Sequence, residues 1–496
     1  MKRRATALIS SAVCAALLSG CDLAPVYDPP HFILPASYKG SGPFTVANPD
    51  EALSPRGDWW TLFDDPELNQ LEDQLGTANP TLQAAADAYA EARSLAAQAQ
   101  SGLSPQVSAS AGVSENKQSV DRLFRSPVAH SPIREASNQF GVAASWEPDF
   151  WYALRNYAHA QKRLAQASAA DLESARLSLQ AELASDYIAL RGLDAQGEVL
   201  RQSITSYQSA VEVARLRTMG KIASGLDLAR ALSQLDSAQA QETETRLQRD
   251  LMQHAVAVLV GAVPSTFSIA PSKDFRLTPP KLPTGVPSQL LQRRPDIASA
   301  ERQMAAANAS IGVSRAAFYP NVTFNLSGGF QDSGFNLISL PNSLWSVGAG
   351  AVLPLFDGGL RRAQLRHSWA QYSQTRDNYR ATVLAAFQEV EDGLSQTQRL
   401  TTEDTQQHEA GDQAGQALSI STMLYNDGLD NYLSVSVAQV QALAAQLAEV
   451  QIRVRQVQAA VSLIRALGGG WTVQELPDER QTLQFTEADY GVSDKK

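Results

Sequence analysis

Apolar and small polar residues alternate in the stretch Val107-Ser108-Ala109-Ser110-Ala111-Gly112-Val113-Ser114. This alternation is the main indication of the fold class. Successive side chains of a β-strand point to opposite faces, so a period of two predicts a strand with one apolar and one polar face. Three later segments repeat the pattern. We place the four strands at about residues 104–115, 138–150, 319–331 and 343–356. Their alternating parts run for about 9–11 residues, the length that a tilted strand needs to cross hydrocarbon.

Four strands are too few for a membrane barrel, since the smallest single-chain barrels have about eight. Open sheet edges are not tolerated in lipid, because their backbone groups would have no hydrogen-bond partner. If these strands are membranous, several chains must pool them. A soluble sandwich is the alternative, but two hairpins isolated among long helices give it a poor core. The strand pattern therefore predicts an oligomer and leaves the number of chains open.

The strands belong to two halves of the chain that follow the same plan. Asn79-Pro80-Thr81-Leu82 opens an alanine-rich segment that stops at Pro105, and Arg294-Pro295-Asp296-Ile297 opens another that stops at Pro320. Each is followed by two alternating stretches and a very long proline-free region. A glycine-containing break interrupts each region, at residues 219–224 and at residues 426–431. The order helix, strand, loop, strand, long helix, turn, long helix thus occurs twice, which predicts two internal structural repeats.

The proline-free regions carry a seven-residue repeat of apolar residues. It is clearest in the final region, at Val440, Leu443, Leu447, Val450, Val454, Val457, Val461 and Ile464. A heptad repeat is typical of supercoiling helices, and the many alanine, glutamine and serine residues on other faces permit neighbours on both sides. A helix from about Ala153 to Met219 would be on the order of 100 Å long, which suits a tube that crosses a periplasm.

The first residues predict export and lipidation. Lys2, Arg3 and Arg4 precede an apolar run that ends in Leu18-Ser19-Gly20-Cys21. This is the pattern of a secretory signal with a lipoprotein cleavage site, so we expect residues 1–20 to be removed and Cys21 to carry palmitate-type acyl chains. The only other cysteine, Cys14, lies inside the signal, so the mature chain is expected to have no disulfide. No later apolar stretch is long enough to span a membrane as a helix.

Composition and motifs argue against several function classes. Removal of the three basic residues of the signal takes the net charge from −10 to −13, which disfavours nucleic acid as a partner. The six histidines are scattered, and no HExxH or phosphate-binding glycine loop is present. We therefore expect no enzyme activity, no catalytic residues, no metal site and no cofactor.

Several motifs resemble one known family. Val286-Pro-Ser-Gln-Leu-Leu-Gln-Arg-Arg-Pro-Asp-Ile297 resembles the signature of the outer-membrane factor (TolC-type) family, and more closely that of NodT-type lipoproteins of RND efflux systems. Trp59-Trp60-Thr61-Leu62-Phe63-Asp64-Asp65-Pro66 and Leu467-Gly468-Gly469-Gly470-Trp471 are similar to the same branch, and the resemblance covers about residues 22–475.

The resemblance implies a mixed α/β membrane protein that forms a homotrimer. Its twelve-stranded β-barrel, with four strands per chain, would sit in the outer membrane and continue as a twelve-helix tunnel into the periplasm, with an equatorial domain around it. The partners implied are a periplasmic adaptor (membrane fusion protein), an RND inner-membrane pump and outer-membrane lipid. The function implied is the exit duct of a tripartite efflux pump that exports small molecules such as drugs.

These inferences divide the chain into six parts. They are a lipoprotein signal peptide (1–20), a lipid-anchored extended segment (21–65), a first repeat (66–263), an inter-repeat equatorial linker (264–286), a second repeat (287–470) and a C-terminal equatorial tail (471–496). The segments 116–137 and 331–342 are interpreted as polar extracellular loops between barrel strands.

The two helical breaks are the candidate functional sites, since in the resembled family the corresponding tips close the periplasmic mouth of the tunnel. The resemblance places gate residues on Tyr425–Asn431 and a pore-facing aspartate at Asp430. Asp427 and Asp227 are further gate candidates, and Arg217, Arg215 and Tyr425 are expected to form polar links between the tips. The simpler interpretation makes Asp427 a turn residue and Asp227 a helix cap.

Two other functions stay open on the sequence alone. One is a structural periplasmic coiled-coil lipoprotein without a pore, which would have no use for lipid-length hairpins. The other is a type I secretion exit duct for proteins, although the lipobox and the NodT-like motifs favour small molecules.

Overall fold

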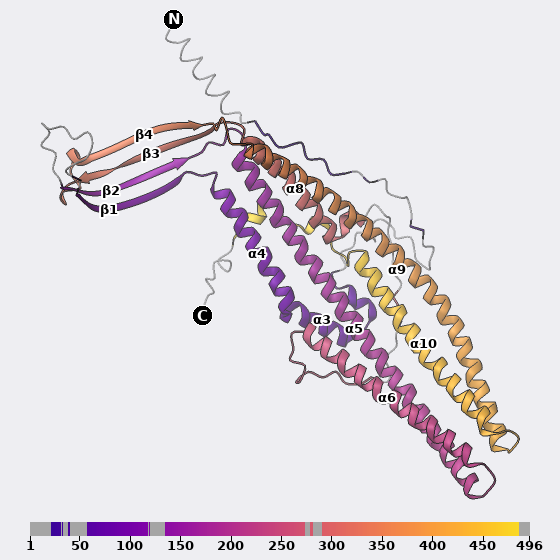
Figure 1. Cartoon of the computed structure of the whole chain (residues 1–496). Helices are drawn as coiled ribbons and strands as arrows, with labels where there is room; N and C mark the ends of the chain where they lie inside the picture. The colour runs from indigo at the N-terminus through magenta and orange to yellow at the C-terminus, as the bar shows by residue number, and fades with distance from the viewer. Residues whose placement is uncertain are drawn as a thin grey trace.

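The computed structural model describes residues 21–30, 32, 38–39, 57–117, 119, 134–272, 278–280 and 290–485. The predicted signal peptide and most of the first predicted extracellular loop lie outside these residues. The described part is elongated, with a sheet at one end and long helices that run away from it in a single direction (Figure 1).

The sheet contains four strands, β1 (Gln106–Lys117), β2 (Arg134–Trp146), β3 (Asn321–Asp332) and β4 (Ser343–Val352). They are antiparallel and lie in the order β1-β2-β3-β4. All four predicted strands are present, with shifted ends. β1 and β2 pair through Lys117 and Arg134, beyond the apolar alternation, whereas β4 ends before Pro354, which has no N–H to donate.

The register sorts the side chains by polarity. Val107, Ala144, Leu326 and Val347 form one row across the sheet, and the next row is Ser108, Ala143, Ser327 and Ser346. Rows alternate in this way along most of the strands, so one face is mainly apolar and the other consists mainly of small or amide side chains, with Leu344 as an exception. Within the single chain the apolar row is exposed, with Val107 at 69% and Val347 at 68%. A soluble sandwich would bury this face, so the predicted membrane sheet is the better interpretation.

The segment from Asp332 to Ser343, which joins β3 to β4, differs from the prediction. It was expected to be a polar loop, but Phe335, Ile338 and Leu340 are 82%, 91% and 85% exposed. The segment connects β3 to β4 as the predicted loop does, but its polarity was overestimated, because Pro341 and the charge of Asp332 were given more weight than the large apolar side chains.

The two helical hairpins have identical lengths. α5 (Ala153–Met219) and α9 (Leu360–Asn426) have 67 residues each, and α6 (Gly225–Leu259) and α10 (Tyr432–Ala466) have 35 each. α4 (Pro80–Ser101) and α8 (Pro295–Ala316) have 22 each. Every long element begins and ends within a few residues of a proline or glycine, which is why the sequence predicted these boundaries.

Four helices lie side by side at each level of the helical part. Near the sheet the order is α4, α5, α8, α9, and farther away it is α6, α5, α10, α9 (Figure 1). The main core lies between these levels, where α3 (Pro66–Ala78) and the 3-10 turn η1 (Trp59–Phe63) cover α5. Short 3-10 turns at Val473–Glu475 and Gln481–Leu483 carry the C-terminal tail along α4 and α5.

α10 corrects one expectation about apolar segments. It is long and apolar enough to span a membrane by length and composition, with a mean hydropathy of 1.2 over its best window. Four of its eight predicted heptad positions are buried, namely Leu443, Val457, Val461 and Ile464. Three more are half-buried, and Val440 near the tip is exposed. Since α10 packs along α9 and α5, its apolar residues serve as the seam of a helical layer.

Candidate functional site

The tip of the α9–α10 hairpin is a Schellman turn. The N–H of Gly428 donates to the carbonyl of Tyr425 (3.0 Å), and that of Leu429 donates to Leu424 (2.9 Å). Gly428 has φ +78°, the left-handed conformation that this turn requires. The Asn431 side chain then caps α10 by accepting from the N–H of Leu433.

The α5–α6 tip repeats this geometry with different residues. Ile222 donates to the carbonyl of Arg217 (2.9 Å), and Ser224 caps α6 by accepting from Leu226. The left-handed position falls on Lys221, with φ +57°, while the neighbouring Gly220 is right-handed. A non-glycine residue in this conformation costs about 1 kcal/mol, so the first tip stores strain that the second does not.

Arg217 connects the two tips. Its guanidinium carbon lies 4.4 Å from the centre of the Tyr425 ring, and its Nη2 donates to the carbonyl oxygen of Asn426 at 2.8 Å. The predicted link between Arg217 and Tyr425 is therefore present within the chain. Arg215, the other predicted link, is exposed, and its side chain makes no hydrogen bond or ion pair to the described residues.

A buried tyrosine cluster lies behind this link. Tyr425 and Tyr432 pack edge to face with ring centres 5.4 Å apart, and both are buried. Tyr432 donates to the amide oxygen of Gln439 (3.3 Å), and Tyr207 donates to the Gln439 carbonyl (3.1 Å). Burial, followed by the neighbouring Tyr425, Tyr207 and Asp227, raises the pKa of Tyr432 to about 12, so it stays neutral. Sequence reasoning missed Tyr432 and Tyr207, although large aromatics in alanine-rich helices were a usable clue.

The three candidate carboxylates lie at the tips in different ways. Asp430 is half-buried in the second turn, and its Oδ1 accepts from the N–H of Asn431 at 2.7 Å. Asp427 is exposed and ends α9. Asp227 lies in the first turn of α6, three residues beyond the capping Ser224, so it is neither the cap nor the counterpart of Asp430. In the described part of the chain none of the three forms an ion pair, which leaves their charges available.

The opposite end of the helical part holds the predicted anchor. Cys21 is exposed, and its backbone N–H donates to the carbonyl of Phe150 at 3.1 Å, where β2 leads into α5. The Asp22 carboxylate accepts from the Asn156 side chain (2.9 Å), and Arg315 donates to the Leu23 carbonyl (3.0 Å). The chain therefore leaves Cys21 at the level where strands give way to helices.

Two of the motifs quoted above form equivalent joints in the two halves. The side chain of Asn79 donates to the carbonyl of Leu259 at 2.7 Å, and that of Arg294 donates to the carbonyl of Ala466 at 3.0 Å. Each thus satisfies the final carbonyl of a returning helix. Gly468, at φ +91°, lies so close to the Arg293 carbonyl that a Cβ would be 1.9 Å from its oxygen. The Arg-Arg-Pro-Asp and Gly-Gly-Gly-Trp motifs are therefore two sides of one contact.

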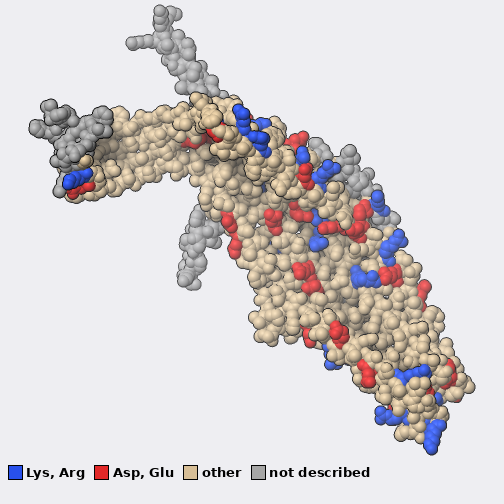
Figure 2. Space-filling view, viewed as in Figure 1, with Lys and Arg blue, Asp and Glu red and all other residues tan. Residues whose placement is uncertain are grey.

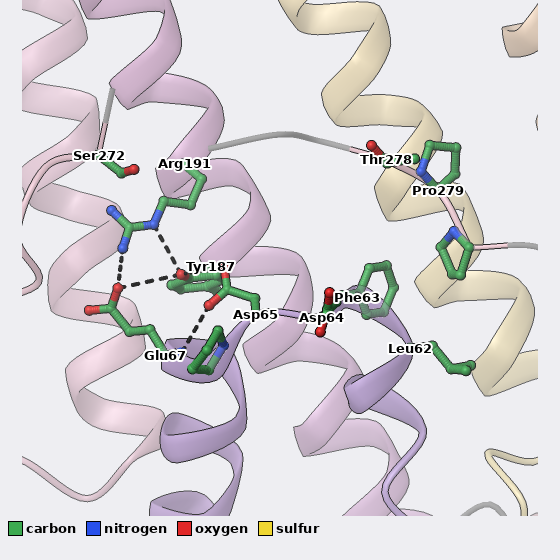
Figure 3. Close-up of a pocket in the computed structure, with 12 residues that line it drawn as sticks. Leu62, Phe63, Asp64, Asp65, Glu67, Tyr187, Arg191, Ser272, Thr278 and Pro279 are labelled. Carbon is green, nitrogen blue, oxygen red and sulfur yellow. Dashed lines mark hydrogen bonds and ion pairs between the residues drawn. The ribbon is translucent and has the colours of Figure 1, made fainter. Parts of the chain in front are cut away.

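A polar cleft of about 770 Å³ lies where η1 and the start of α3 cover α5 (Figure 3). On its wall Arg191 binds Asp194 (2.9 Å), Tyr187 (3.1 Å) and Glu67, and Tyr187 donates to Asp65 (2.9 Å). Asp65 also caps α3. The bonds from Arg191 and Tyr187 of α5 to Glu67 and Asp65 hold the Trp-Trp-Thr-Leu-Phe-Asp-Asp-Pro segment against α5. No group of three or more possible metal ligands occurs among residues that the structure describes.

Comparison with known proteins places this architecture. Residues 71–262 and 286–469 match the family described as outer membrane efflux protein. The chain belongs to this family. It is 31% identical over 417 residues to the pyoverdine export outer membrane protein OpmQ of Pseudomonas aeruginosa, covering 83% of this chain and 87% of OpmQ. It is 29% identical over 473 residues to the outer membrane protein OprJ of the same species, covering 93% and 96%.

Solved structures agree with the family. The outer-membrane channel OprN superimposes with a TM-score of 0.84 at 27% identity, covering 91% of this chain and all of that one. The Campylobacter jejuni CmeC outer membrane channel gives a TM-score of 0.85 at 23% identity over 94% of this chain and 99% of CmeC, a likeness of fold. The predicted outer-membrane factor resemblance is confirmed. This chain is an outer-membrane efflux channel whose helices extend into the periplasm, and its family transports rather than catalyses.

Proposed function

We propose that three copies of this chain form one continuous duct. Three chains with four strands each give a twelve-stranded barrel, and three chains with four helices at each level give a twelve-helix tunnel. In this assembly the two hairpin halves act as structural repeats, residues 66–263 and 287–470. The extended segment 21–65 carries the lipid anchor, and the linker 264–286 and the tail 471–496 contribute to the equatorial domain.

The observation that carries the proposal is the open sheet. β1 and β4 both leave one edge unpaired within the chain, while the apolar face is fit for lipid. An unpaired edge in hydrocarbon costs several kcal/mol for each backbone group. Because β1 and β4 run antiparallel, β4 of one copy can pair with β1 of the next, and repetition of this contact closes the ring.

Cysteine cross-linking tests this contact. The mature sequence has no cysteine besides Cys21, so new thiols report without background. Ser108→Cys or Ser110→Cys in β1, combined with Ser346→Cys or Gly348→Cys in β4, should give intermolecular disulfides that run as dimers and trimers. Each single variant serves as the control. Folded double variants that stay monomeric in every combination would refute the barrel.

The gate is proposed at the two tips. Arg217 and Tyr425 hold the hairpins of one protomer together, and threefold symmetry gathers Asp430, Asp427 and Asp227 from three protomers around the pore axis. A ring of carboxylates attracts cations and raises the electric field across a narrow opening. The polar link supports this role because it crosses between hairpins at the end of the tunnel farthest from the sheet.

The proposed partners follow from the family's place in efflux. The tips project away from the membrane, where a periplasmic adaptor and an RND inner-membrane pump would meet them. Relatives named for pyoverdine export and for toluene efflux carry different small molecules, which supports small molecules as the cargo here. Copurification of a tagged chain with an adaptor tests this proposal. If the channel instead exported a protein substrate, the alternative of a type I secretion exit duct would be favoured.

The lipid anchor is proposed at Cys21. An acylated amino terminus is an amide that keeps one N–H, so the bond from Cys21 to the Phe150 carbonyl is compatible with lipidation. The exposed thiol lies beside the strand-to-helix junction, within reach of the inner leaflet. Mass spectrometry of the mature protein should find a diacylglyceryl cysteine. A free amino terminus at any other residue would contradict the anchor.

A further inference from the structure

The far end of the sheet holds a second binding surface. We propose that the segment Ser333–Asn342 and the apolar face of β1–β3 together bind an acyl chain of lipopolysaccharide in the outer leaflet. The inference rests on the proposed barrel, which sets the apolar face toward lipid. It adds a ligand and a site that the transport of cargo does not require.

The first step is the side of the sheet on which this segment lies. Asn138 belongs to the row that contains Val113 and Asp332, on the apolar face. It is 4% exposed, although it sits near the end of an otherwise exposed sheet, and its side chain donates to the carbonyl of Gly334. The segment therefore starts by folding over the apolar face.

The second step is the cavity beneath the segment. It has a volume of about 700 Å³ and is lined mainly by apolar side chains, with Ala111, Val113, Phe140 and Phe330 from the strands and Phe335 and Ile338 from the segment. Asn138, Gln139 and Asn336 complete much of the wall, and none of the lining residues is charged. A site of this kind favours a hydrocarbon chain over a charged or peptide ligand.

The third step is the position along the membrane normal. The helices leave from one end of the sheet (Figure 1), and the strand residues that line the cavity lie toward the other end. A duct whose helices are periplasmic therefore puts the cavity in the outer leaflet. Charged side chains of the strands occur only near this end, as Glu115, Lys117 and Asp332, and the middle of the sheet is free of them (Figure 2). That change from apolar to charged marks the depth at which acyl chains meet headgroups. The outer leaflet of this membrane consists of lipopolysaccharide, which identifies the ligand class.

The shape of the segment supports insertion rather than projection into water. The N–H of Asn336 donates to the Asp332 carboxylate at 3.0 Å, and Asn342 donates to the Asn336 carbonyl at 2.8 Å. These bonds fold the segment into a compact hook. Phe335 and Ile338, at the open side of the cavity, and Leu340 are largely exposed, as the side chains of an interfacial anchor are.

Photocrosslinking in living cells tests the site. Benzoyl-phenylalanine is introduced at Ile338, and adducts are identified after irradiation by mass spectrometry and with an antibody to lipid A. Leu326 and Ser327 provide matched controls, since they are adjacent in β3 and face the apolar and polar sides. We expect lipopolysaccharide adducts at Ile338, lipid adducts at Leu326 and none at Ser327. Ala111→Trp, which fills the cavity floor, should abolish the Ile338 adduct and leave the Leu326 adduct and the trimer intact.

The outcomes separate this inference from the proposed duct. Adducts at Leu326 without any at Ile338 would overturn the acyl site and leave the barrel standing. Adducts at Ile338 that contain only phospholipid, or a neighbouring protomer, would also overturn it. Absence of lipid adducts at both positions would contradict the barrel itself.

Discussion

The guanidinium of Arg217 lies on the ring of Tyr425, 4.4 Å from its centre, and donates to the backbone of Asn426. One residue of the α5–α6 hairpin thus holds both a side chain and a carbonyl at the end of α9. In the proposed gate the tunnel opens when the hairpins move apart, and this contact would oppose that movement.

Arg217→Ala should therefore loosen the closed tips. A cation–π contact with a charged hydrogen bond is worth about 2 kcal/mol when partly buried, so the open state should gain population about thirtyfold. Single-channel recording in planar bilayers measures this as more frequent opening. Tyr425→Phe is the matched control, because the ring remains and the Tyr425 hydroxyl has no partner within the described structure. Equal open probability in Arg217→Ala and the parent would show that this contact does not hold the gate closed.

The strain at Lys221 gives a second prediction. Lys221→Gly removes a side chain from a residue with a left-handed φ. Gly428→Ala places a side chain on the residue with a left-handed φ in the equivalent turn. The first change should stabilise its tip by up to about 1 kcal/mol, and the second should destabilise its tip by about the same amount. Hydrogen exchange of the tip amides reports these changes locally. Protection that moves in the same direction for both variants would be inconsistent with the turn geometry.

Asp430 gives the third prediction. Replacing it with alanine should remove a ring of three charges and weaken the block by multivalent cations from the periplasmic side. Asp404 is a poor control, because its carboxylate lies 3.8 Å from Arg453. Glu409 is exposed and lies on α9 away from the tip, so Glu409→Ala is the better comparison. Asp430 is only a turn residue if both variants are blocked as strongly as the parent.

Glu72 gives the fourth prediction. It is 1% exposed on α3, and neither carboxylate oxygen finds a hydrogen-bond partner among the described residues. Burial, then the charge of Asp73, raises the pKa of Glu72 to about 9. The unfolded chain releases this proton at about pH 4, so Glu72 lowers stability progressively as the pH rises from about 4 to about 9.

Glu72→Leu should therefore raise the midpoint of thermal unfolding, and by more at pH 8 than at pH 5. The gain at pH 8 should be a few kcal/mol, since the folded parent protein must keep Glu72 protonated at a pH at which the unfolded chain releases the proton. Asp73→Asn, at the exposed neighbour, should change the midpoint little. A gain of equal size at both pH values would show that the pKa of Glu72 is the same in the folded and the unfolded protein, which would contradict this account.

The sequence predicted the elements well, because prolines and glycines mark nearly every boundary. The strands followed from alternation that the register then sorted into two faces. Resemblance led to Arg217 and Tyr425, which the structure brings into contact. The burial of Glu72 and the hydrogen bonds of Tyr432 and Tyr207 to Gln439 could not be predicted, since both depend on which helix faces pack together. The polarity of the segment after β3 was overestimated for a different reason, because its apolar residues were given too little weight.

The central claim is that three chains share one barrel, and the mass of the particle tests it most directly. The protein is extracted in mild detergent, and native mass spectrometry counts the chains in each detergent-free ion. Since one chain supplies four strands with two open edges, the account predicts a particle of three chains that releases monomers only on unfolding. A folded, stable monomer, or a particle with another number of chains, would contradict it.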